Sequence, residues 1–312
     1  MRWGWLAFVA ACTTTTEPTT NDVVQDVTMC PDQVVEGVDV FTGSGMIDWA
    51  KLAGSGRGFA FIKATQGDYN KQTTFATNWT NAAANGVKRS PYHFFDGTKD
   101  GIAQATAFLD SVTAVGGLGS GDLPAMLDIE CPTSSVEASA QKDCEYAGDS
   151  GWVATDVLNQ RIFDWLDAVE TATGRKPIIY SYPSWFAAAK VTDPRLADYP
   201  LFIASYNTCA TIPAPWTTAT FWQYSATATV PGITGNVDTD RFFGSATDLD
   251  GFAIQPPPPP NYASDAGIDT PMETEKPAGC GCQTDSAAGG WPGFVIAMLL
   301  LRRRTVKKLP RT

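Results

Sequence analysis

Residues 35–65 read VEGVDVFTGSGMIDWAKLAGSGRGFAFIKAT, and this stretch indicates the fold class. It begins and ends with short runs of β-branched and aromatic residues, at 35–41 and 59–65, which are typical of strands. Between them, residues 47–53 have apolar side chains at helical spacing, which predicts a helix. A strand, a helix and a second strand in succession form the βαβ unit of parallel sheets.

The same alternation continues along the chain. We expect eight strands, at residues 35–41, 59–65, 87–95, 125–130, 177–182, 201–206, 221–225 and 236–243. We expect helices at residues 47–53, 75–85, 102–115, 156–173 and 185–190. Eight strands within one domain, at residues 34–252, predict an α/β fold with a closed (β/α)8-like barrel of the TIM type. Because no helical pattern lies between residues 201 and 243, the outer ring of helices should be incomplete.

Composition excludes several functions. The chain has 312 residues, 44% of them hydrophobic, so it can bury a large core. Its net charge is −11, although several basic residues gather at the two ends. A body this acidic is a poor partner for nucleic acid, whose binding depends on neutralising phosphates. The single histidine, His93, excludes a metal site with several histidines, and we expect neither a metal nor a cofactor.

The first 12 residues predict export. Arg2 precedes the apolar run 3–11, and the small residues before Cys12 suit a secretory signal. The ending Val9-Ala10-Ala11-Cys12 resembles a bacterial lipobox, in which the cysteine is lipidated; the alternative is an ordinary signal in which Cys12 is incidental. Residues 13–33 are a Thr-rich segment, which we expect to be a spacer.

The last 60 residues, at 253–312, also predict a surface protein. Residues 253–278 form a Pro-rich linker, with five consecutive prolines at 256–260. Residues 279–312 combine Cys280 and Cys282, a short apolar transmembrane segment at 291–301 and a basic tail. This order resembles the MYXO-CTERM sorting signal of myxobacterial surface proteins, and a plain C-terminal membrane anchor is the alternative. Both predict an exported protein anchored at the cell surface, in the outer membrane or in the periplasm.

Four cysteines lie between these ends, an even number that predicts disulfides in an oxidising compartment. Cys131 and Cys144 bracket a polar insertion, so a local bond between them is the simplest pairing. That pairing leaves Cys30 with Cys209.

Acidic residues lie in three of the predicted strands. They are Asp39 in the first strand, Asp128 and Glu130 at the end of the fourth, and Asp238 with Asp240 in the eighth. Residues i and i+2 of a strand share a face, so the Cα atoms of Asp128 and Glu130 should lie about 6.6 Å apart on one side. Two carboxyl groups at about this separation suit a glycosidase. The alternative is a solvated strand end or an ion pair.

Several motifs together carry a resemblance to glycoside hydrolase family 25, the Chalaropsis-type lysozymes. They occur in the family's order between residues 35 and 243. The resemblance implies a flattened barrel with fewer than eight helices. It also implies cleavage, with net retention, of the β-1,4 bond between N-acetylmuramic acid and N-acetylglucosamine in peptidoglycan. The motifs are Gly37-Val38-Asp39-Val40, Ile47-Asp48-Trp49, Phe61-Ile62-Lys63-Ala64-Thr65-Gln66-Gly67, Tyr92-His93-Phe94-Phe95, Leu127-Asp128-Ile129-Glu130, Ile179-Tyr180-Ser181, Ala204-Ser205-Tyr206, Phe221-Trp222-Gln223-Tyr224 and Val237-Asp238.

Carried onto these positions, the resemblance makes Glu130 the general acid/base and Asp128 its partner. Asp39 and Asp238 become the two further acids of the site. The resemblance leaves open whether Asp128 attacks the sugar directly or assists a reaction of the substrate's own N-acetyl group. The family often has Glu where Gln66 stands, so one charge is missing near the end of the second strand.

Four aromatic residues and the histidine are candidates for contacts with the sugar. Aromatic faces pack on pyranose CH groups, which suits Tyr92, Tyr180, Tyr206 and Trp222. For each of them the alternative is packing in the core. His93 either lines the site or is a hydrogen-bonded residue of the barrel.

Two other classes of protein remain open. One is a different barrel glycosidase with an acid pair, such as a chitinase. The other is a surface protein that binds peptidoglycan without cleaving it; such a protein would normally have lost the acids, and all four are present. The expected partner is the peptidoglycan glycan strand. Nothing in the sequence specifies an oligomer, so we expect a monomer.

Overall fold

The computed structural model describes residues 26–130 and 153–255. The expected leader at residues 1–12, most of the Thr-rich spacer, the Cys131–Cys144 pair and the C-terminal tail with Cys280 and Cys282 lie outside these residues. Among the residues that are described, no helix is both long enough and apolar enough to cross a membrane.

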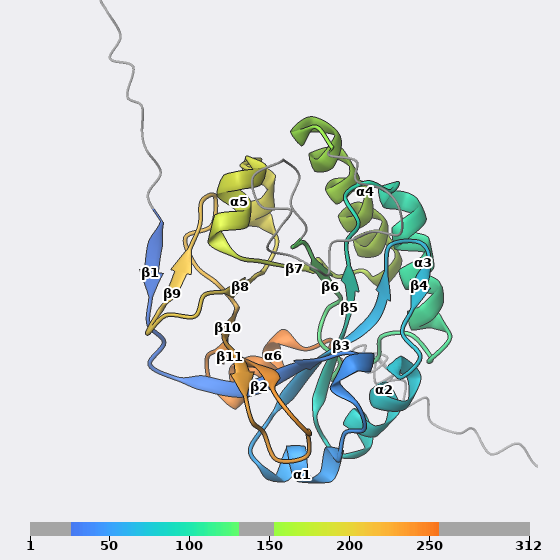
Figure 1. Cartoon of the computed structure of the whole chain (residues 1–312), viewed down its shortest axis with the longest axis vertical. Helices are drawn as coiled ribbons and strands as arrows, with labels where there is room; N and C mark the ends of the chain where they lie inside the picture. Colours follow the sequence, from blue (N-terminus) through green and yellow to red (C-terminus); the bar gives the residue numbers. More distant parts are fainter. Residues whose placement is uncertain (1–25, 131–152, 256–312) are drawn as a thin grey trace, which may run out of the picture. The chain divides into compact units, whose positions relative to one another are not determined.

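Eight strands close into a barrel, which confirms the predicted fold class (Figure 1). The strands pair in a ring, which is closed by the pairing of β2 with β3, the first two barrel strands in the chain. The β6 strand ends at Asp128, so Glu130 lies two residues beyond it rather than inside it as predicted. In ring order the strands are β2 (Val34–Val40), β3 (Phe59–Gln66), β5 (Lys88–Phe94), β6 (Met126–Asp128), β7 (Ile178–Ser181), β8 (Leu201–Ala204), β10 (Phe221–Ala228) and β11 (Val237–Phe243).

One strand runs against the others. β11 is antiparallel to both of its neighbours, β10 and β2, while the remaining neighbours in the ring are parallel. The start of β11 therefore lies at the same end of the barrel as the C-terminal ends of the other strands. At that end of the barrel, Asp39 and Asp128 lie near the C-terminal ends of β2 and β6, and Asp238 lies near the N-terminal end of β11.

Aromatic rings fill the inside of the barrel. Phe221 contacts Phe59 and Phe61 edge to face, with ring centroids 5.2 and 5.1 Å apart, and Phe61 lies 4.8 Å from Phe202. All four rings are fully buried. Gly37 leaves room for this cluster, because a Cβ atom there would clash with the ring of Phe59. The interior is thus a packed core, and the pocket described below lies at one end of it.

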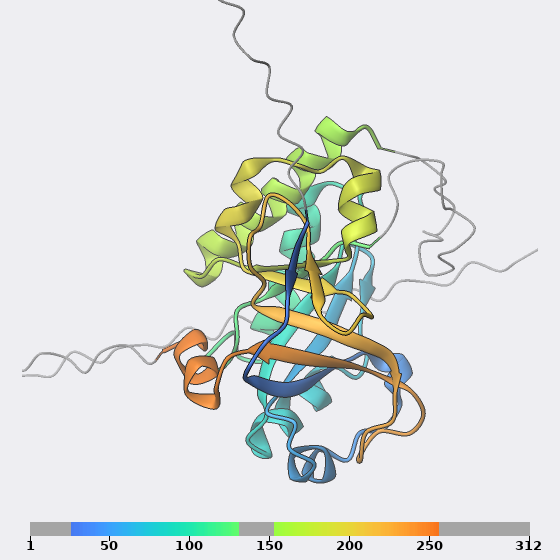
Figure 2. The ribbon, with the colours of Figure 1, turned by 90° about the vertical axis from the view of Figure 1, so that its left-hand side faces the viewer.

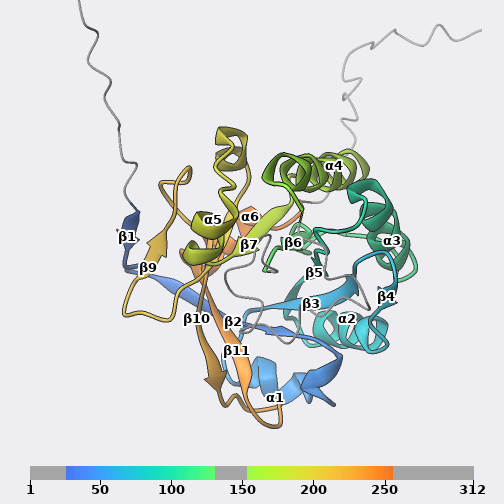
Figure 3. The same ribbon diagram turned by 45° about the horizontal axis from the view of Figure 1, so that its top comes forward.

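The helices cover the outside of part of the barrel. α4 shows why they form: Leu158, Ile162, Trp165, Leu166 and Val169 recur every three or four residues, and all are buried. Gly174 ends this helix in the left-handed conformation that glycine favours. Figure 3 shows α2, α3 and α4 side by side outside β3, β5 and β6. The helices are α1 (Trp49–Gly54), α2 (Phe75–Ala84), α3 (Gly101–Thr113), α4 (Thr155–Thr173), α5 (Pro183–Ala189) and α6 (Ala246–Phe252).

The ring of helices is incomplete, as expected. Among the described residues, no helix lies between β8 and β11 in the chain. That segment instead contains β9 (Ala210–Ile212), which pairs antiparallel with β1 (Val27–Met29) outside the barrel (Figure 2). A short strand, β4 (Asn70–Lys71), forms a hairpin with the end of β3. Among the described residues, short 3-10 helices lie at Thr42–Ser44 and Pro194–Asp198.

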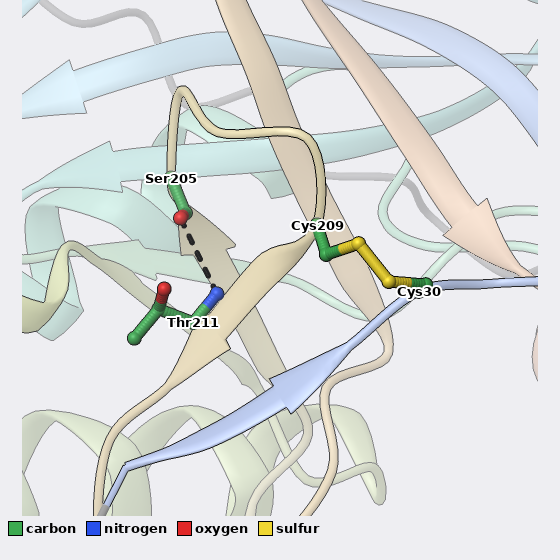
Figure 4. Close-up of a disulfide and its surroundings, with 4 residues drawn as sticks. All are labelled: Cys30, Ser205, Cys209 and Thr211. Atoms are coloured by element: carbon green, nitrogen blue, oxygen red, sulfur yellow. Dashed lines mark hydrogen bonds between the residues drawn. A yellow bond between two sulfur atoms is a disulfide. The ribbon is translucent and has the colours of Figure 1, made fainter.

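A disulfide joins Cys30 to Cys209, with 4.7 Å between their Cα atoms. The sequence analysis predicted this pair, because Cys30 and Cys209 remained once Cys131 was paired with Cys144. It connects the N-terminal segment to the loop before β9 (Figure 4).

Candidate active site

A pocket of about 530 Å³ opens at the end of the barrel where the parallel strands terminate. The four acids expected at the site all line it, so the structure brings together residues that are up to 199 positions apart in the chain. Three of the predicted aromatic residues line it as well. The lining residues are Asp39, Phe41, Thr42, Gly43, Lys63, Gln66, Asn70, Gln72, Tyr92, Phe94, Met126, Asp128, Glu130, Tyr180, Tyr206, Gln223, Ala226 and Asp238.

Asp39 and Asp238 lie directly opposite each other on β2 and β11. Directly opposed residues of antiparallel strands have Cβ atoms about 4.5–5.5 Å apart, so the two carboxyl groups are close. Burial raises the pKa of Asp238 to about 6, and a hydrogen bond with Asp39 opposes this shift. Burial and then the charge of Asp238 raise the pKa of Asp39 well above its ordinary value. The pair therefore holds a proton more readily than two exposed carboxylates would.

Asp128 is the last residue of β6, and Glu130 lies two residues beyond it; both line the pocket. Asp128 is 4% exposed and shares a side-chain hydrogen bond with Glu130. Burial and then the charge of Glu130 raise the pKa of Asp128 well above its ordinary value. The buried Oδ1 atom of Asp128 accepts no hydrogen bond from any residue that the structure describes. The arrangement offers a carboxyl pair that can move a proton and an acceptor free for an incoming donor.

Lys63 is the one basic residue among the described residues that line the pocket. Its Nζ donates to Oε1 of Gln66 over 3.1 Å and lies 4.2 Å from the ring centroid of Phe94. The charge of Lys63 lowers the pKa of Asp128, against the larger effect of burial. Gln66 thus faces the pocket from the end of β3, where the sequence had indicated a missing charge.

Gln223 connects three of these side chains, and the sequence analysis did not single it out. Its Nε2 donates to Oδ2 of Asp39 over 2.7 Å. Its Oε1 accepts from the hydroxyl groups of Tyr180, at 3.0 Å, and Tyr206, at 2.6 Å. The signal was present in the alternation of β10, because Gln223 shares a strand face with the interior residue Phe221. A buried amide on that face has to find polar partners.

Tyr92, Tyr180 and Tyr206 lie in the pocket, as predicted. Tyr92 and Tyr180 are almost fully buried, whereas Tyr206 is 59% exposed at the rim. Phe41, which the sequence analysis did not select, is a second exposed ring of the rim. Two exposed rings on one pocket suit contacts with sugar faces.

The structure contradicts a place for His93 and Trp222 in the pocket and supports the alternatives, because both side chains face away from it. His93 is fully buried between β5 and the helices, stacked on Trp165 and hydrogen-bonded to Thr65 and Gln104. Burial lowers the pKa of His93 to about 3, so its ring is neutral. Trp222 is 1% exposed on the outer face of β10, where its Nε1 donates to the carbonyl of Ser205 over 2.6 Å. Adjacent residues of a strand face opposite sides of the sheet. Tyr92 and Gln223 face the pocket, so their neighbours in the chain, His93 and Trp222, point outward.

Asp240 lies one step deeper in the barrel than Asp238 and does not line the pocket. It is fully buried, and neither of its carboxyl oxygens has a hydrogen-bond partner among the described residues. Burial and then the charge of Asp238 raise the pKa of Asp240 well above its ordinary value.

Metal ligands do not gather here: within residues 26–130 and 153–255, no group of three or more His, Cys, Asp or Glu side chains is placed to hold a metal ion.

Comparisons with known proteins agree with this geometry. The profile described as Glycosyl hydrolases family 25 matches residues 38–233. "Lysozyme M1" of Streptomyces globisporus is 34% identical over 69% of this chain and 70% of its own length. "N,O-diacetylmuramidase" of Chalaropsis sp is 30% identical over 65% of this chain and 96% of its own length. The crystal structure of the bacterial lysozyme from Streptomyces coelicolor matches with a TM-score of 0.60 and 32% identity, covering 71% of this chain and 98% of that one.

Proposed function

Because the chain belongs to Glycosyl hydrolases family 25 and is therefore a glycoside hydrolase, we propose that it is a muramidase acting on bacterial peptidoglycan. The family expected from the sequence motifs is thereby confirmed. The proposed reaction hydrolyses the β-1,4 bond between N-acetylmuramic acid and N-acetylglucosamine, with retention of the anomeric configuration. The protein is proposed to act as a monomer. The names of the relatives, lysozyme and N,O-diacetylmuramidase, support this substrate. The observation that carries the proposal is the gathering of Asp39, Asp128, Glu130 and Asp238 in one pocket.

Glu130 is the proposed general acid. It lines the pocket and shares a hydrogen bond with Asp128, which gives the pair one proton to place between two carboxyl groups. Donation of that proton to the glycosidic oxygen lets the C–O bond break and the N-acetylglucosamine unit leave as an alcohol. Glu130, now ionised, then takes a proton from the water that attacks the sugar.

Asp128 is proposed to assist the substrate's own 2-acetamido group rather than to attack the sugar. In this route the acetamido oxygen bonds to the anomeric carbon as the glycosidic bond breaks, and water later opens the cyclic oxazolinium ion. The buried Oδ1 of Asp128, which accepts no hydrogen bond from the described residues, suits the acetamido N–H. Nearby negative charge stabilises the positive intermediate. A thiazoline analogue of N-acetylmuramic acid should therefore inhibit the enzyme, and inhibition should be lost in Asp128→Asn.

The reaction can be tested on purified peptidoglycan. Borohydride reduction of the products should convert muramic acid, and not glucosamine, into its alcohol, because the new reducing ends belong to N-acetylmuramic acid. Chitin is the control for the alternative chitinase-like activity. Binding to peptidoglycan without any new reducing ends would instead support the non-catalytic alternative.

Glu130→Gln tests the assignment of the acid. The amide preserves shape but cannot titrate, so kcat should fall by about 10²–10⁴-fold with KM little changed. The matched control is Asp110→Asn, the same kind of change at an exposed position of α3. Turnover by a folded Glu130→Gln protein at the rate of the control would contradict the assignment.

We also propose that the protein is exported and anchored at the cell surface, in the outer membrane or in the periplasm. The basic and apolar start, the Cys12 lipobox-like ending and the C-terminal tail support this location. The Cys30–Cys209 disulfide supports it too, since disulfides persist in oxidising compartments. Cell fractionation and mass spectrometry of the mature N-terminus test the proposal; a protein recovered wholly in the cytosol, with residues 1–11 intact, would refute it.

A further inference from the structure

The N-terminal segment is connected to the rim of the pocket through a small structure outside the barrel. β1 pairs with β9 through Val27↔Ile212, Thr28↔Thr211 and Met29↔Ala210. One residue beyond each strand, Cys30 and Cys209 form the disulfide that joins parts of the chain 179 residues apart (Figure 4). This sheet and its disulfide therefore fix the position of the loop that enters β9.

That loop begins at Ser205, directly after β8. The backbone N–H of Ser205 donates to the carbonyl of Gln223, and its own carbonyl accepts from Nε1 of Trp222. Its Oγ accepts from the backbone N–H of Thr211 over 3.3 Å, which closes the loop on itself (Figure 4). Cys209 lies inside this closed loop, so the disulfide holds the loop at its far side while Ser205 holds it at the barrel.

Tyr206 is the residue of this loop that reaches the site. The residue is 59% exposed, so little packing holds it in place. Its hydroxyl donates to Oε1 of Gln223 over 2.6 Å, and Nε2 of Gln223 donates to Oδ2 of Asp39 over 2.7 Å. Oε1 of Gln223 also accepts from the hydroxyl of Tyr180 over 3.0 Å, and the two tyrosines together fix the orientation of the amide, which leaves Nε2 facing the carboxylate. A continuous series of contacts thus runs from the disulfide to an acid of the site.

We propose that the Cys30–Cys209 disulfide, with the β1–β9 sheet, is a positioning device of the active site. It holds the loop 205–211 so that Tyr206, together with Tyr180, keeps Gln223 donating to Asp39, and full activity therefore requires the bond to be oxidised. Cleavage by a dithiol such as dithiothreitol transfers two electrons and two protons to the bond, giving two thiols and cyclic oxidised dithiothreitol. The activity arm of the test rests on the proposed muramidase function.

A double-mutant cycle tests the path. C30S/C209S should lower kcat/KM by about 3- to 10-fold, mainly through kcat, which corresponds to loss of one typical hydrogen bond. In the background of Tyr206→Ala, the same pair of substitutions should change kcat/KM by less than about twofold, because the residue through which the bond acts is gone. Equal effects in both backgrounds would overturn the proposal, as would wild-type activity in C30S/C209S.

Reduction of the oxidised protein gives an independent comparison. Dithiothreitol should lower the activity of wild type and of C131S/C144S by the same factor, and should leave C30S/C209S unchanged. Loss of the effect in C131S/C144S would assign it to the other cysteine pair and overturn the proposal. A C30S/C209S protein without the far-UV circular dichroism of wild type would also overturn it, since the bond would then stabilise the whole barrel.

A spectroscopic readout separates this proposal from the proposed function. In protein labelled with ¹⁵N-glutamine, the side-chain amide of Gln223 reports its hydrogen bond to Asp39 without any substrate, and Gln223→Glu assigns its signal. The signal should move towards that of an exposed amide in C30S/C209S and in Tyr206→Phe. Absence of muramidase activity in wild type would refute the proposed function alone, whereas an unmoved Gln223 signal in C30S/C209S would refute the positioning role.

Discussion

Asp238 should make the protein less stable as the pH rises, and Asp238→Asn should remove this dependence. Burial raises the pKa of Asp238 from 3.8 to about 6. Between these values the folded protein holds a proton that the unfolded chain has released, so unfolding loses a proton and stability falls with increasing pH. Its contribution is complete below about pH 4 and is lost as the pH passes upward through 6. A shift of roughly 2 units corresponds to about 3 kcal/mol, since one unit is 1.36 kcal/mol.

Urea unfolding at several values between pH 3.5 and 8 measures this effect. The free energy of unfolding of Asp238→Asn, minus that of wild type, should increase by about 3 kcal/mol across the range, whatever its value at pH 3.5. Asp39 adds to this increase, because removing the charge opposite it lowers the raised pKa of Asp39. Thr227→Ala, an exposed change on β10 that alters no titrating group, is the control and should parallel wild type. A constant or decreasing difference for Asp238→Asn would refute the reasoning.

Three further predictions test the packing and the rim of the pocket. His93→Leu should lower the free energy of unfolding in urea by about 1–3 kcal/mol, because it leaves the buried hydroxyl of Thr65 without its hydrogen-bond partner. The kcat of the folded enzyme should stay unchanged; a large loss of kcat would indicate that His93 belongs to the site after all. Gly37→Ala should cost about 1–3 kcal/mol by overpacking against the interior rings, whereas Gly54→Ala, with open space around its Cβ position in α1, should stabilise by about 0.5–1 kcal/mol; equal melting temperatures would contradict this. Phe41→Ala should raise KM about 2- to 10-fold on long glycan strands and leave kcat within about twofold, since we expect this exposed ring at the pocket to contact sugar without joining the chemistry; an unchanged KM would exclude that contact.

The resemblance to the family selected Asp238 over Asp240, whereas the sequence pattern itself brought Asp39, Asp128 and Glu130 together. Each follows or lies within a short apolar run, and the ends of parallel strands meet at one end of a barrel, so Asp39, Asp128 and Glu130 had to be neighbours. The eight strands of the barrel and the missing helices also followed from the pattern, because β-branched runs and helical periodicity are local properties of the chain; the short strands β1, β4 and β9 were not predicted. Cys30 and Cys209 could be paired only after another pairing had been assumed.

The direction of β11 was decided only by the tertiary structure. In a uniformly parallel barrel Asp240, nearer the end of the strand, would be the better candidate for the site. Because β11 runs the other way, its first acid, Asp238, faces Asp39, and Asp240 is buried below. β10 and β11 are consecutive and antiparallel, so the short segment between them turns back at one end of the barrel, whereas a parallel strand would need a longer crossover.

The orientation of each strand was likewise decided by the fold. Alternation shows that Tyr92 and His93, or Gln223 and Trp222, point to opposite faces, but not which face is which. In most sheets polarity settles the question, since one face meets water. Here both faces are buried, the inner one among aromatic rings and the outer one beneath helices and loops, so an apolar Trp222 and a polar His93 both fit outside. Only closure of the barrel fixes which side chains share the pocket.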